Sequence, residues 1–420
     1  MTTVAEVRLW GSLIGAVAYE EGALAARFQY NPDFVGSGIE VSPITMPLST
    51  AVYQFPALSQ RSFHGLPGLL ADSLPDTFGN AVINAWLAST GRPSDALNPV
   101  ERLCYTGVRG MGALEFSPTI GPKSTTSSVV YVDRLVELAS EVLAHRDSLE
   151  VSFDDREKAE ALRDILRVST SAGGARAKAV VAWNEKTGDV RSGQVATEEG
   201  FTYWVLKFDG VSGNRDKEMN DPLGYGAIEY AYHRMAVAAG IEMAECRLLE
   251  EGGRRHFMTR RFDRRRNGEK VHMQSLGGIA HFDYNEAGLH SYEQALSIIR
   301  RLGLGMGAIE SQFRRMVFNV VSRNQDDHVK NIAFLMDRSG SWSLAPAFDV
   351  TYAFQPDGLW TSRHQMTING KQDGFLMADF EACANSASMK RGRAATIIDV
   401  VLTVVSRWRE YAEDAGVVSR

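Results

Sequence analysis

An aspartate and an asparagine in the C-terminal half of the chain have the types and the spacing that phosphoryl transfer requires. Asp326 and Asn331 are separated by four residues, in a polar run that begins at Asn324 and includes His328 and Lys330. Phosphoryl transfer requires a carboxylate at the attacking hydroxyl and oxygen ligands for Mg²⁺ on the nucleotide phosphates. This spacing supplies both kinds of group on one loop.

Asp349 supplies a third oxygen group of this kind. It follows an apolar segment at 332–336 and a turn at 337–340, directly after Phe348. In protein kinases the catalytic-loop aspartate and the metal-binding asparagine have the same separation, and an aspartate after the next hairpin holds Mg²⁺. The spacing alone is a weak signal, because Asn and Asp are common in turns. The predicted elements on both sides of the loop strengthen it.

A run of small residues at 169–178 is a second candidate for contact with phosphate. It contains Gly173 and Gly174, and Arg176 and Lys178 bring positive charge to its end. Small residues let backbone N–H groups approach phosphate oxygens closely. The run lacks the GxxxxGK[ST] spacing, which argues against a P-loop NTPase. A flexible turn before a strand is the alternative interpretation.

Lys207 is a single charge within the apolar segment 203–208. A buried lysine is costly unless it meets an anion, and a kinase lysine meets nucleotide phosphates and a glutamate on a helix. Glu229, on the helix predicted to follow, is the best candidate for that glutamate. The alternative is a charge that keeps an edge strand soluble.

Hydrophobic periodicity predicts the elements that position these residues. Strands are predicted at 7–19 around a Gly-Ser turn, and then at 24–30, 179–183, 203–208, 271–276 and 332–336. Helices are predicted at 78–87, 133–145, 155–166, 229–239 and 312–322. From residue 292 onward the pattern is mostly helical, with an interruption at 324–353.

These motifs together resemble the HipA toxins of bacterial toxin–antitoxin modules. The run from Asn324 to Asn331 looks like the NxDxHxKN catalytic loop of HipA kinases, and residues 347–349 resemble their metal-binding motif. Three further segments resemble parts of the family's kinase domain: 171–178 its phosphate loop, 206–208 its ATP-lysine strand, and 261–263 the link between its lobes. The small domain that precedes the kinase in this family is resembled by the N-terminal part of the chain, at Gly11, Gly15, 74–76 and 110–114.

The resemblance implies an α+β fold. A small β-rich domain is expected at 1–117, followed by a linker at 118–129 that is poor in apolar residues. A two-lobed, protein-kinase-like domain is expected at 130–420. Its N-lobe would span about 130–260 and its largely helical C-lobe 261–420.

The resemblance also implies roles for single residues. Asp326 is the expected catalytic base, with His328 and Lys330 beside it, and Asn331 and Asp349 are the expected Mg²⁺ ligands. The residues expected to bind ATP are Ser171, Gly173, Gly174, Ala175, Arg176, Lys178, Lys207, Glu229, Arg260, Phe262, His328 and Phe348. Ser171 aligns with the serine that these kinases autophosphorylate, and Ser169 and Thr170 are neighbouring alternatives. The chain departs from the family at Arg176-Ala177, where Gln-Glu or Arg-Pro is frequent, and at Arg260, where Glu is frequent.

The implied function is that of an ATP- and Mg²⁺-dependent serine/threonine-protein kinase, the toxin of a type II module. The expected partners are a protein substrate and a helix-turn-helix antitoxin of the HipB kind, with DNA reached only through the antitoxin. A nucleotide-binding pseudokinase that serves as co-repressor is the alternative, and a small-molecule kinase on the same fold is a third possibility. Retention of Lys207, Asp326, Asn331 and Asp349 favours the active protein kinase.

Bulk composition limits the class of protein. The 420 residues, 44% of them hydrophobic, predict about two or three domains. The 45 Lys+Arg and 51 Asp+Glu are too balanced for a general polyanion binder. Cys104, Cys246 and Cys383 are far apart, which disfavours a disulfide framework or a zinc site. With neither a signal-peptide pattern nor a membrane-spanning segment in the sequence, we expect a soluble, cytoplasmic protein.

An arginine-rich run at 254–266 is the remaining charged feature. Such a run could contact DNA phosphates or an acidic partner. The interpretation we prefer is a solvated surface whose arginines pair with neighbouring acids, because most charge runs are of that kind.

Overall fold

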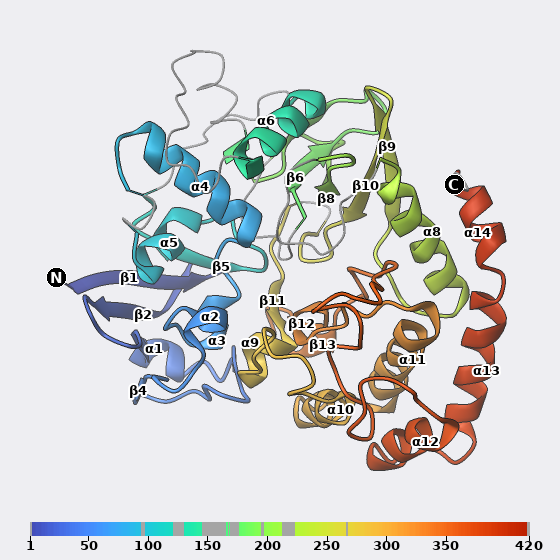
Figure 1. The fold of residues 1–420 in the computed structure, drawn as a ribbon. Coiled ribbons are helices and arrows are strands. Elements are labelled where there is room, and N and C mark those ends of the chain that lie inside the picture. The colour runs from blue at the N-terminus through green and yellow to red at the C-terminus, as the bar shows by residue number, and fades with distance from the viewer. Residues whose placement is uncertain are drawn as a thin grey trace. The chain divides into compact units, whose positions relative to one another are not determined.

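The structure, a computed structural model, describes residues 2–93, 97–120, 130–144, 165–166, 168, 176–194, 197–211, 223–265 and 268–417. The chain forms two compact units, which are drawn in Figure 1. Unit 1 comprises Met1–Ile39, Leu48–Gly226 and Cys246–His272, and unit 2 comprises Glu40–Pro47, Ala227–Glu245 and Met273–Arg420. Each unit has its own hydrophobic core.

The N-terminal sheet of unit 1 is built largely from hairpins. Its strands are β1 (Thr2–Leu9), β2 (Ser12–Glu20), β3 (Arg27–Tyr30), β4 (Val52–Tyr53) and β5 (Leu114–Ser117), in the antiparallel order β4-β3-β2-β1-β5. Trp10 and Gly11 join β1 to β2 with φ values of 50° and 85°, the left-handed backbone that a type I′ turn requires. The strands predicted at 7–19 and 24–30 are confirmed. Short helices accompany this sheet: α1 (Pro32–Val35), α2 (Gln60–Phe63), α3 (Gly68–Ala71) and α5 (Pro99–Thr106).

The second sheet of unit 1 carries Lys207. Its strands are β6 (Lys178–Trp183), β7 (Val190–Ser192), β8 (Thr202–Lys207), β9 (Cys246–Glu251) and β10 (Arg254–Arg260), in the order β7-β6-β8-β10-β9. Helices α4 (Thr77–Ser89) and α6 (Val132–Ala144) share a core with this sheet. These elements confirm the strands predicted at 179–183 and 203–208 and the helices predicted at 78–87 and 133–145. The predicted helix at 155–166 lies almost wholly outside the described residues.

Helix α4 belongs to the part of the chain assigned to the predicted N-terminal domain. It begins at Asp76, whose Oδ1 accepts a hydrogen bond from the backbone N–H of Gly79 at 2.6 Å and so caps the helix. Phe78 of this helix is buried in the same cluster as Val181 of β6 and Leu206 of β8. The apolar face of α4 therefore completes the core of the second sheet, while the boundaries at 1–117, 118–129 and 130–420 stay a prediction.

Unit 2 is mostly helical. Its helices are α8 (Tyr225–Ala238), α9 (Leu276–Ala280), α10 (Tyr292–Arg301), α11 (Met306–Ser322), α12 (Met377–Ser386), α13 (Arg393–Val405) and α14 (Trp408–Asp414), and the first two residues of α8 belong to unit 1. Figure 1 shows α11 alongside α13, where Phe313 and Met316 share a core with Ile397 and Val401. The predicted α+β class with a helical C-terminal part is confirmed. Within the described ranges, no helix is both long enough and apolar enough to cross a membrane.

A small sheet lies beside these helices and carries the candidate catalytic loop. Its strands are β11 (His272–Ser275), β12 (Ala333–Met336) and β13 (Trp342–Leu344), in the order β11-β12-β13. Leu276 N–H donates to the carbonyl of Ile332 at 2.7 Å and ties the start of α9 to the entry of β12. The strands predicted at 271–276 and 332–336 are confirmed.

The segment 345–376 differs from the prediction, which ended the irregular region at 353. It contains no named helix or strand, and all of it is described. Pro356 and Gly358 disfavour a helix there. The backbone pairs with other loops instead: Gln325 N–H donates to the Ala353 carbonyl, and Tyr292 N–H to the Thr367 carbonyl, both at 3.0 Å.

The arginine-rich run corrects a second prediction. Arg261 and Asp263 are 3% and 0% exposed, and Arg261 Nη2 lies 2.6 Å from Asp263 Oδ2. Arg264 Nη1 lies 2.8 Å from the same oxygen, and its Nη2 donates to the Gly110 carbonyl at 3.0 Å. The predicted pairing with a neighbouring acid is confirmed. The predicted surface location is wrong for Arg261 and Arg264, because Asp263 and backbone carbonyls stabilise their charges inside the protein.

Candidate active site

The candidate catalytic loop begins where α11 ends. Arg323 terminates the helix in the left-handed conformation, with a φ of 57°. Asn324 is buried, and its Nδ2 donates to Asn319 Oδ1 at 3.0 Å, back in the last turns of the helix. A short 3-10 helix, η1 (Val329–Asn331), then leads into β12. Both ends of the loop are therefore held by regular structure.

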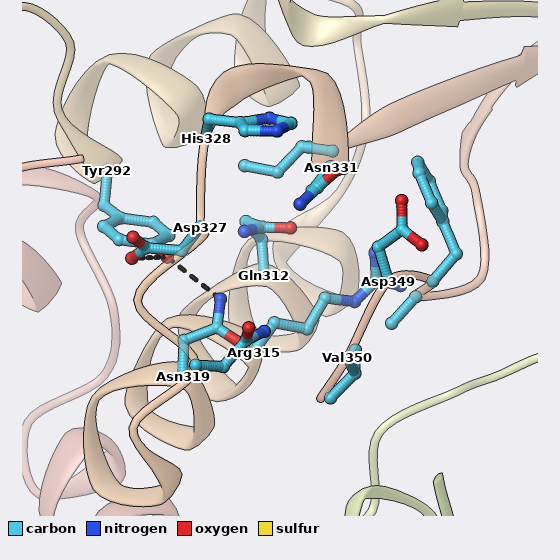
Figure 2. Close-up of a pocket in the computed structure, with 13 residues that line it drawn as sticks. Tyr292, Gln312, Arg315, Asn319, Asp327, His328, Asn331, Asp349 and Val350 are labelled. Carbon is cyan, nitrogen blue, oxygen red and sulfur yellow. Dashed lines mark hydrogen bonds between the residues drawn. The ribbon is translucent and has the colours of Figure 1, made fainter. Parts of the chain in front are cut away.

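Asp327 is buried in a polar network. Its Oδ2 accepts hydrogen bonds from the Tyr292 hydroxyl at 2.7 Å and from His364 Nδ1 at 2.8 Å, and its Oδ1 accepts one from Gln365 N–H at 2.7 Å. Asn319 Nδ2 donates to the Tyr292 oxygen at 3.0 Å, as Figure 2 shows. Burial, and secondly the Asp327 carboxylate, raise the pKa of Tyr292 well above its usual value, so that its hydroxyl remains a donor. Three internal donors occupy this carboxylate.

Asp326, the preceding residue, has a different environment. Its side chain is 44% exposed, and its Oδ1 accepts a hydrogen bond from Trp360 Nε1 at 2.8 Å. His328 Nε2 lies 3.8 Å from the same oxygen. Asp326 is therefore held in a defined position while part of its carboxylate remains open to solvent.

Asn331 and Asp349 line one pocket that opens to solvent. Asn331 Nδ2 donates to the Asp326 carbonyl at 2.8 Å, which leaves its Oδ1 as the acceptor atom of the amide. Asp349 has a φ of 52°, an uncommon backbone conformation for a residue other than glycine. Such outliers cluster at functional sites, where the surrounding structure holds them.

These two side chains fit a shared Mg²⁺ site. Mg²⁺ is usually held by one or two protein oxygens together with substrate phosphates and water. The described residues contain no group of three or more His, Cys, Asp or Glu side chains that would hold a metal ion without such help. Asn331 Oδ1 and the Asp349 carboxylate would therefore act together with phosphate oxygens.

Arg315 forms part of the wall of the same pocket. It is 7% exposed, its Nη2 donates to the Ala345 carbonyl at 2.8 Å, and Figure 2 shows its side chain extending toward Asp349. Burial lowers the pKa of Arg315 to about 10, and Glu242 opposes this effect. The guanidinium stays charged at neutral pH and brings positive charge to the wall of the pocket. Arg315 is not among the residues predicted from the sequence, where its only signal is a charge on the buried face of a predicted helix.

The other residues predicted for this loop lie at its outer end. Lys330 Nζ lies 4.3 Å from the centre of the Tyr284 ring, and the His328 ring lies 6.0 Å from the same ring. His328 and Phe348 line the pocket with Asn331 and Asp349. The structure thus brings four of the predicted residues to one pocket.

The two lysines predicted to bind ATP lie on adjacent strands of the second sheet. Lys207 ends β8 and pairs in register with Lys178 of β6 and Phe257 of β10. Lys178 is buried, and its Nζ lies 3.5 Å from Asp76 Oδ2. This ion pair engages the ammonium group that the sequence analysis assigned to phosphate.

The remaining predicted residues are placed as follows. Arg176 stacks over the Tyr225 ring at 4.3 Å from its centre, Arg260 ends β10, and Phe262 follows it, partly buried. Glu229 is 1% exposed on α8. The rest of the glycine-rich run, Ser169, Thr170, Ser171, Gly173, Gly174 and Ala175, lies outside the described residues.

Comparison with known protein families matches two segments of the chain. The sequence matches the HipA-like C-terminal domain over residues 170–408 and the HipA N-terminal domain over residues 5–117. The chain belongs to the HipA-like family. The matched C-terminal domain includes the loop from Asn324 to Asn331 and Asp349.

Two relatives of this HipA-like protein bear kinase names. One, "Putative kinase Y4mE" of Sinorhizobium fredii, is 26% identical over 197 residues, which are 43% of this chain and 46% of that protein. The other, "Putative kinase" of Haemophilus influenzae, is 26% identical over 134 residues, 29% of this chain and 39% of that protein. The chain thus spans less than half the length of either relative.

A solved structure shares the fold. A chain in the Shewanella oneidensis MR-1 toxin–antitoxin complex of HipA, HipB and operator DNA superimposes with a TM-score of 0.68 at 18% identity, covering 98% of this chain and 90% of that one. This likeness shows the HipA-like architecture. The family match and this likeness therefore agree on a HipA-like fold for the chain.

Proposed function

We propose that this HipA-like protein is an ATP- and Mg²⁺-dependent serine/threonine-protein kinase, the toxin of a type II toxin–antitoxin module that acts in the cytoplasm. The observation that supports it best is the unequal treatment of two adjacent carboxylates. Asp327 is occupied by three internal donors, whereas Asp326 is held by Trp360 and stays 44% exposed. A purely structural role for this loop would not require a carboxylate that is both held in one orientation and exposed to solvent.

In the proposed mechanism Asp326 orients the serine or threonine hydroxyl of the acceptor and accepts its proton. The hydroxyl oxygen forms a bond to the γ-phosphorus of ATP while the bond from that phosphorus to the β–γ bridging oxygen breaks, and ADP leaves. Because the Asn331 amide nitrogen donates to the Asp326 carbonyl, the amide oxygen is directed away from that carbonyl. This oxygen and the Asp349 carboxylate would hold Mg²⁺. When bound, the metal neutralises charge on the phosphates. Arg315 adds a buried positive charge to the wall of the same pocket.

ATP binding in this proposal also uses residues of the second sheet and the glycine-rich run. Lys207 would meet the nucleotide phosphates, with Glu229 as its partner. The resemblance to the family adds Ser171, Gly173, Gly174, Ala175, Arg176, Lys178, Arg260, Phe262, His328 and Phe348. Of these residues, Lys178 already has its charge stabilised by Asp76.

The partners in this proposal are a protein substrate, with Ser171 as the site of self-phosphorylation, and a helix-turn-helix antitoxin like the HipB of the Shewanella complex. DNA would be reached through the antitoxin. The competing function is a pseudokinase that binds nucleotide and acts as co-repressor. The four residue types needed for transfer, at Lys207, Asp326, Asn331 and Asp349, favour the active enzyme.

The experiment that separates these functions is incubation of the purified protein with γ-labelled ATP and Mg²⁺. Covalent labelling of the wild type that is absent from Asp326→Ala supports the kinase, and mass spectrometry of the labelled protein with Ser171→Ala as control locates the phosphate. Nucleotide binding by calorimetry without any labelling, of the protein itself or of added cell extract, would favour the pseudokinase. Magnesium-dependent affinity that is unchanged in both Asn331→Ala and Asp349→Ala would remove the metal assignment.

A further inference from the structure

We propose that Trp360 is a positioning residue for Asp326, and that the segment carrying Trp360 is fastened to the catalytic loop through Asp327. The inference rests on the proposed function, since it concerns how the proposed catalytic base is oriented. Trp360 lies 34 residues after Asp326 in the chain, within the irregular segment that follows Asp349.

The hydrogen bond from Trp360 has a direction that suits this role. The indole Nε1–H donates to Asp326 Oδ1 at 2.8 Å, and the indole has no acceptor atom. Trp360 therefore cannot take the acceptor hydroxyl's proton or compete with Asp326 as a base. With Oδ1 engaged, Oδ2 is the oxygen that remains for the incoming hydroxyl. A carboxylate turned by one donor presents one defined oxygen to its substrate.

The neighbouring carboxylate holds the segment in place. Asp327 accepts hydrogen bonds from His364 Nδ1 at 2.8 Å and from Gln365 N–H at 2.7 Å. The Gln365 side chain in turn donates to the carbonyl of Trp360. Gln372 Nε2 donates to the His364 carbonyl at 2.8 Å and steadies the far side of the segment. Asp327 thus fixes the backbone from which Trp360 reaches Asp326.

Different groups of the segment therefore orient the Asp326 carboxylate and hold the backbone in place. The bonds to Asp327 keep the backbone in position whether or not the indole N–H is present. Loss of the N–H should therefore free the Asp326 carboxylate to rotate without releasing the segment. Misplacement of a catalytic group by about 1 Å costs up to roughly a hundredfold in rate. The loss should appear in the maximum rate of phosphoryl transfer rather than in ATP affinity.

The test compares four full-length proteins: the wild type, Trp360→Phe, the protein with β-(3-benzothienyl)alanine at position 360, and Leu359→Ala. Benzothienylalanine keeps the shape of tryptophan and replaces the N–H by sulfur. Leu359 is 100% exposed and is the matched control in the same segment. The measurements are the initial rate of self-labelling against ATP concentration at one fixed protein concentration, and ATP affinity by calorimetry with Mg²⁺.

We expect both changes at Trp360 to lower the maximum rate roughly ten- to hundredfold with ATP affinity unchanged, and Leu359→Ala to behave as the wild type. A wild-type maximum rate in the benzothienylalanine protein would overturn the role of the N–H. A loss at Trp360 that consists only of weaker ATP binding would overturn it as well. If the wild type itself neither labels itself nor transfers phosphate to added protein, the proposed kinase function fails, and the inference fails with it.

Discussion

Two segments of this protein, one in each unit, are both rich in charged residues but hold their carboxylates in different environments. Residues 261–264 of unit 1 contain two arginines and an aspartate, and residues 326–331 of unit 2 contain two aspartates, a histidine and a lysine. In unit 1, Asp263 is 0% exposed and accepts hydrogen bonds from Arg261, Arg264 and the Gly112 N–H, all between 2.6 and 2.8 Å. In unit 2, Asp326 is 44% exposed and receives one such bond, from Trp360.

The difference shows that charge density alone does not identify a site for chemistry. Burial would raise the pKa of Asp263, but the Arg261 and Arg264 guanidiniums hold it well below its usual value. A carboxylate so fully paired serves to join segments 110–112 and 261–264. Asp327 resembles Asp263 in this respect, although it lies next to Asp326. The number of internal donors on a carboxylate, more than its neighbours in sequence, separates structural from functional acids.

The comparison predicts the largest effect for Asp326. We expect Asp326→Ala to lower the rate of phosphoryl transfer at least roughly a thousandfold, because the general base and its orienting contact are both lost. Its free energy of unfolding should change by no more than about 0.5 kcal/mol, as for other part-exposed side chains. Self-labelling with ATP and chemical denaturation measure the two quantities. Activity close to that of the wild type would show that Asp326 is not the base.

Removal of Asp263 should have the largest effect on stability. Asp263→Ala leaves two buried guanidiniums without their anion, and we expect the free energy of unfolding to fall by about 3–5 kcal/mol. The folded pKa lies below the unfolded value of about 3.9, so Asp263 stabilises the protein at all pH values above that value. Its contribution is lost only as the pH falls further, toward the folded pKa.

The control for Asp263 is an exposed ion pair in the same unit. Arg8 and Glu6 lie 2.8 Å apart with side chains 38% and 49% exposed. Glu6→Ala should lower the free energy of unfolding by less than about 1 kcal/mol. Urea unfolding of both variants at pH 7 makes the comparison. A similar decrease in the free energy of unfolding in the two variants would mean that the buried Asp263 cluster stabilises the protein no more than an exposed ion pair does.

Asp327→Asn should have a smaller effect on stability than Asp263→Ala. An asparagine keeps one acceptor oxygen but places an NH₂ group against the donors of Tyr292 and His364, and we expect a loss of about 2 kcal/mol. Asp326→Asn is the matched control and should leave the free energy of unfolding unchanged. Thermal and urea unfolding distinguish them. Equal stability of the two asparagine variants would contradict the division of roles between the adjacent carboxylates.

The parts of the site that could be predicted from sequence are those set by local spacing. Asp326 and Asn331 lie on one loop, and the elements around them follow from periodicity, so loop, hairpin and helix were predicted together. The contacts that distinguish Asp326 from Asp327 were not predictable, because Tyr292 and His364 are 35 and 37 residues away from Asp327. Hydrogen bonds across such distances depend on the packing of a whole unit.

The same limit explains the error about the arginines. Asp263 reaches the backbone of Gly112 across 151 residues, and a single sequence carries no record of that approach. The prediction of ion pairing was correct, since arginines in a charge run usually pair with neighbouring acids and Asp263 lies within this run. Only the three-dimensional structure shows that Arg261 and Asp263 are buried. A charge run therefore predicts pairing better than it predicts location.

The smallest effect that we expect concerns His281 and the dependence of stability on pH. His281 differs from both the paired Asp263 and the part-exposed Asp326. It terminates α9 in the left-handed conformation, with a φ of 56°, and burial lowers its pKa to about 4. Unlike Asp263, it is shifted by burial alone, so the neutral form is favoured in the folded protein. An unfolded histidine has a pKa of about 6.5, and between that value and the folded pKa the unfolded chain binds more protons. Stability must therefore fall as the pH drops through this window.

We expect His281→Asn to lose less stability than the wild type on acidification from pH 7 to pH 5, by about 1 kcal/mol after allowance for partial exposure. Asparagine is the suitable replacement because it tolerates the left-handed backbone. Between pH 7 and pH 8 the two proteins should respond nearly alike, since the His281 side chain is then mostly neutral in both the folded and the unfolded state. Urea unfolding at the three pH values measures this difference. Parallel pH dependence from 7 to 5 would show that His281 is protonated as easily in the folded protein as in the unfolded chain, and that burial at the end of α9 places no cost on its charge.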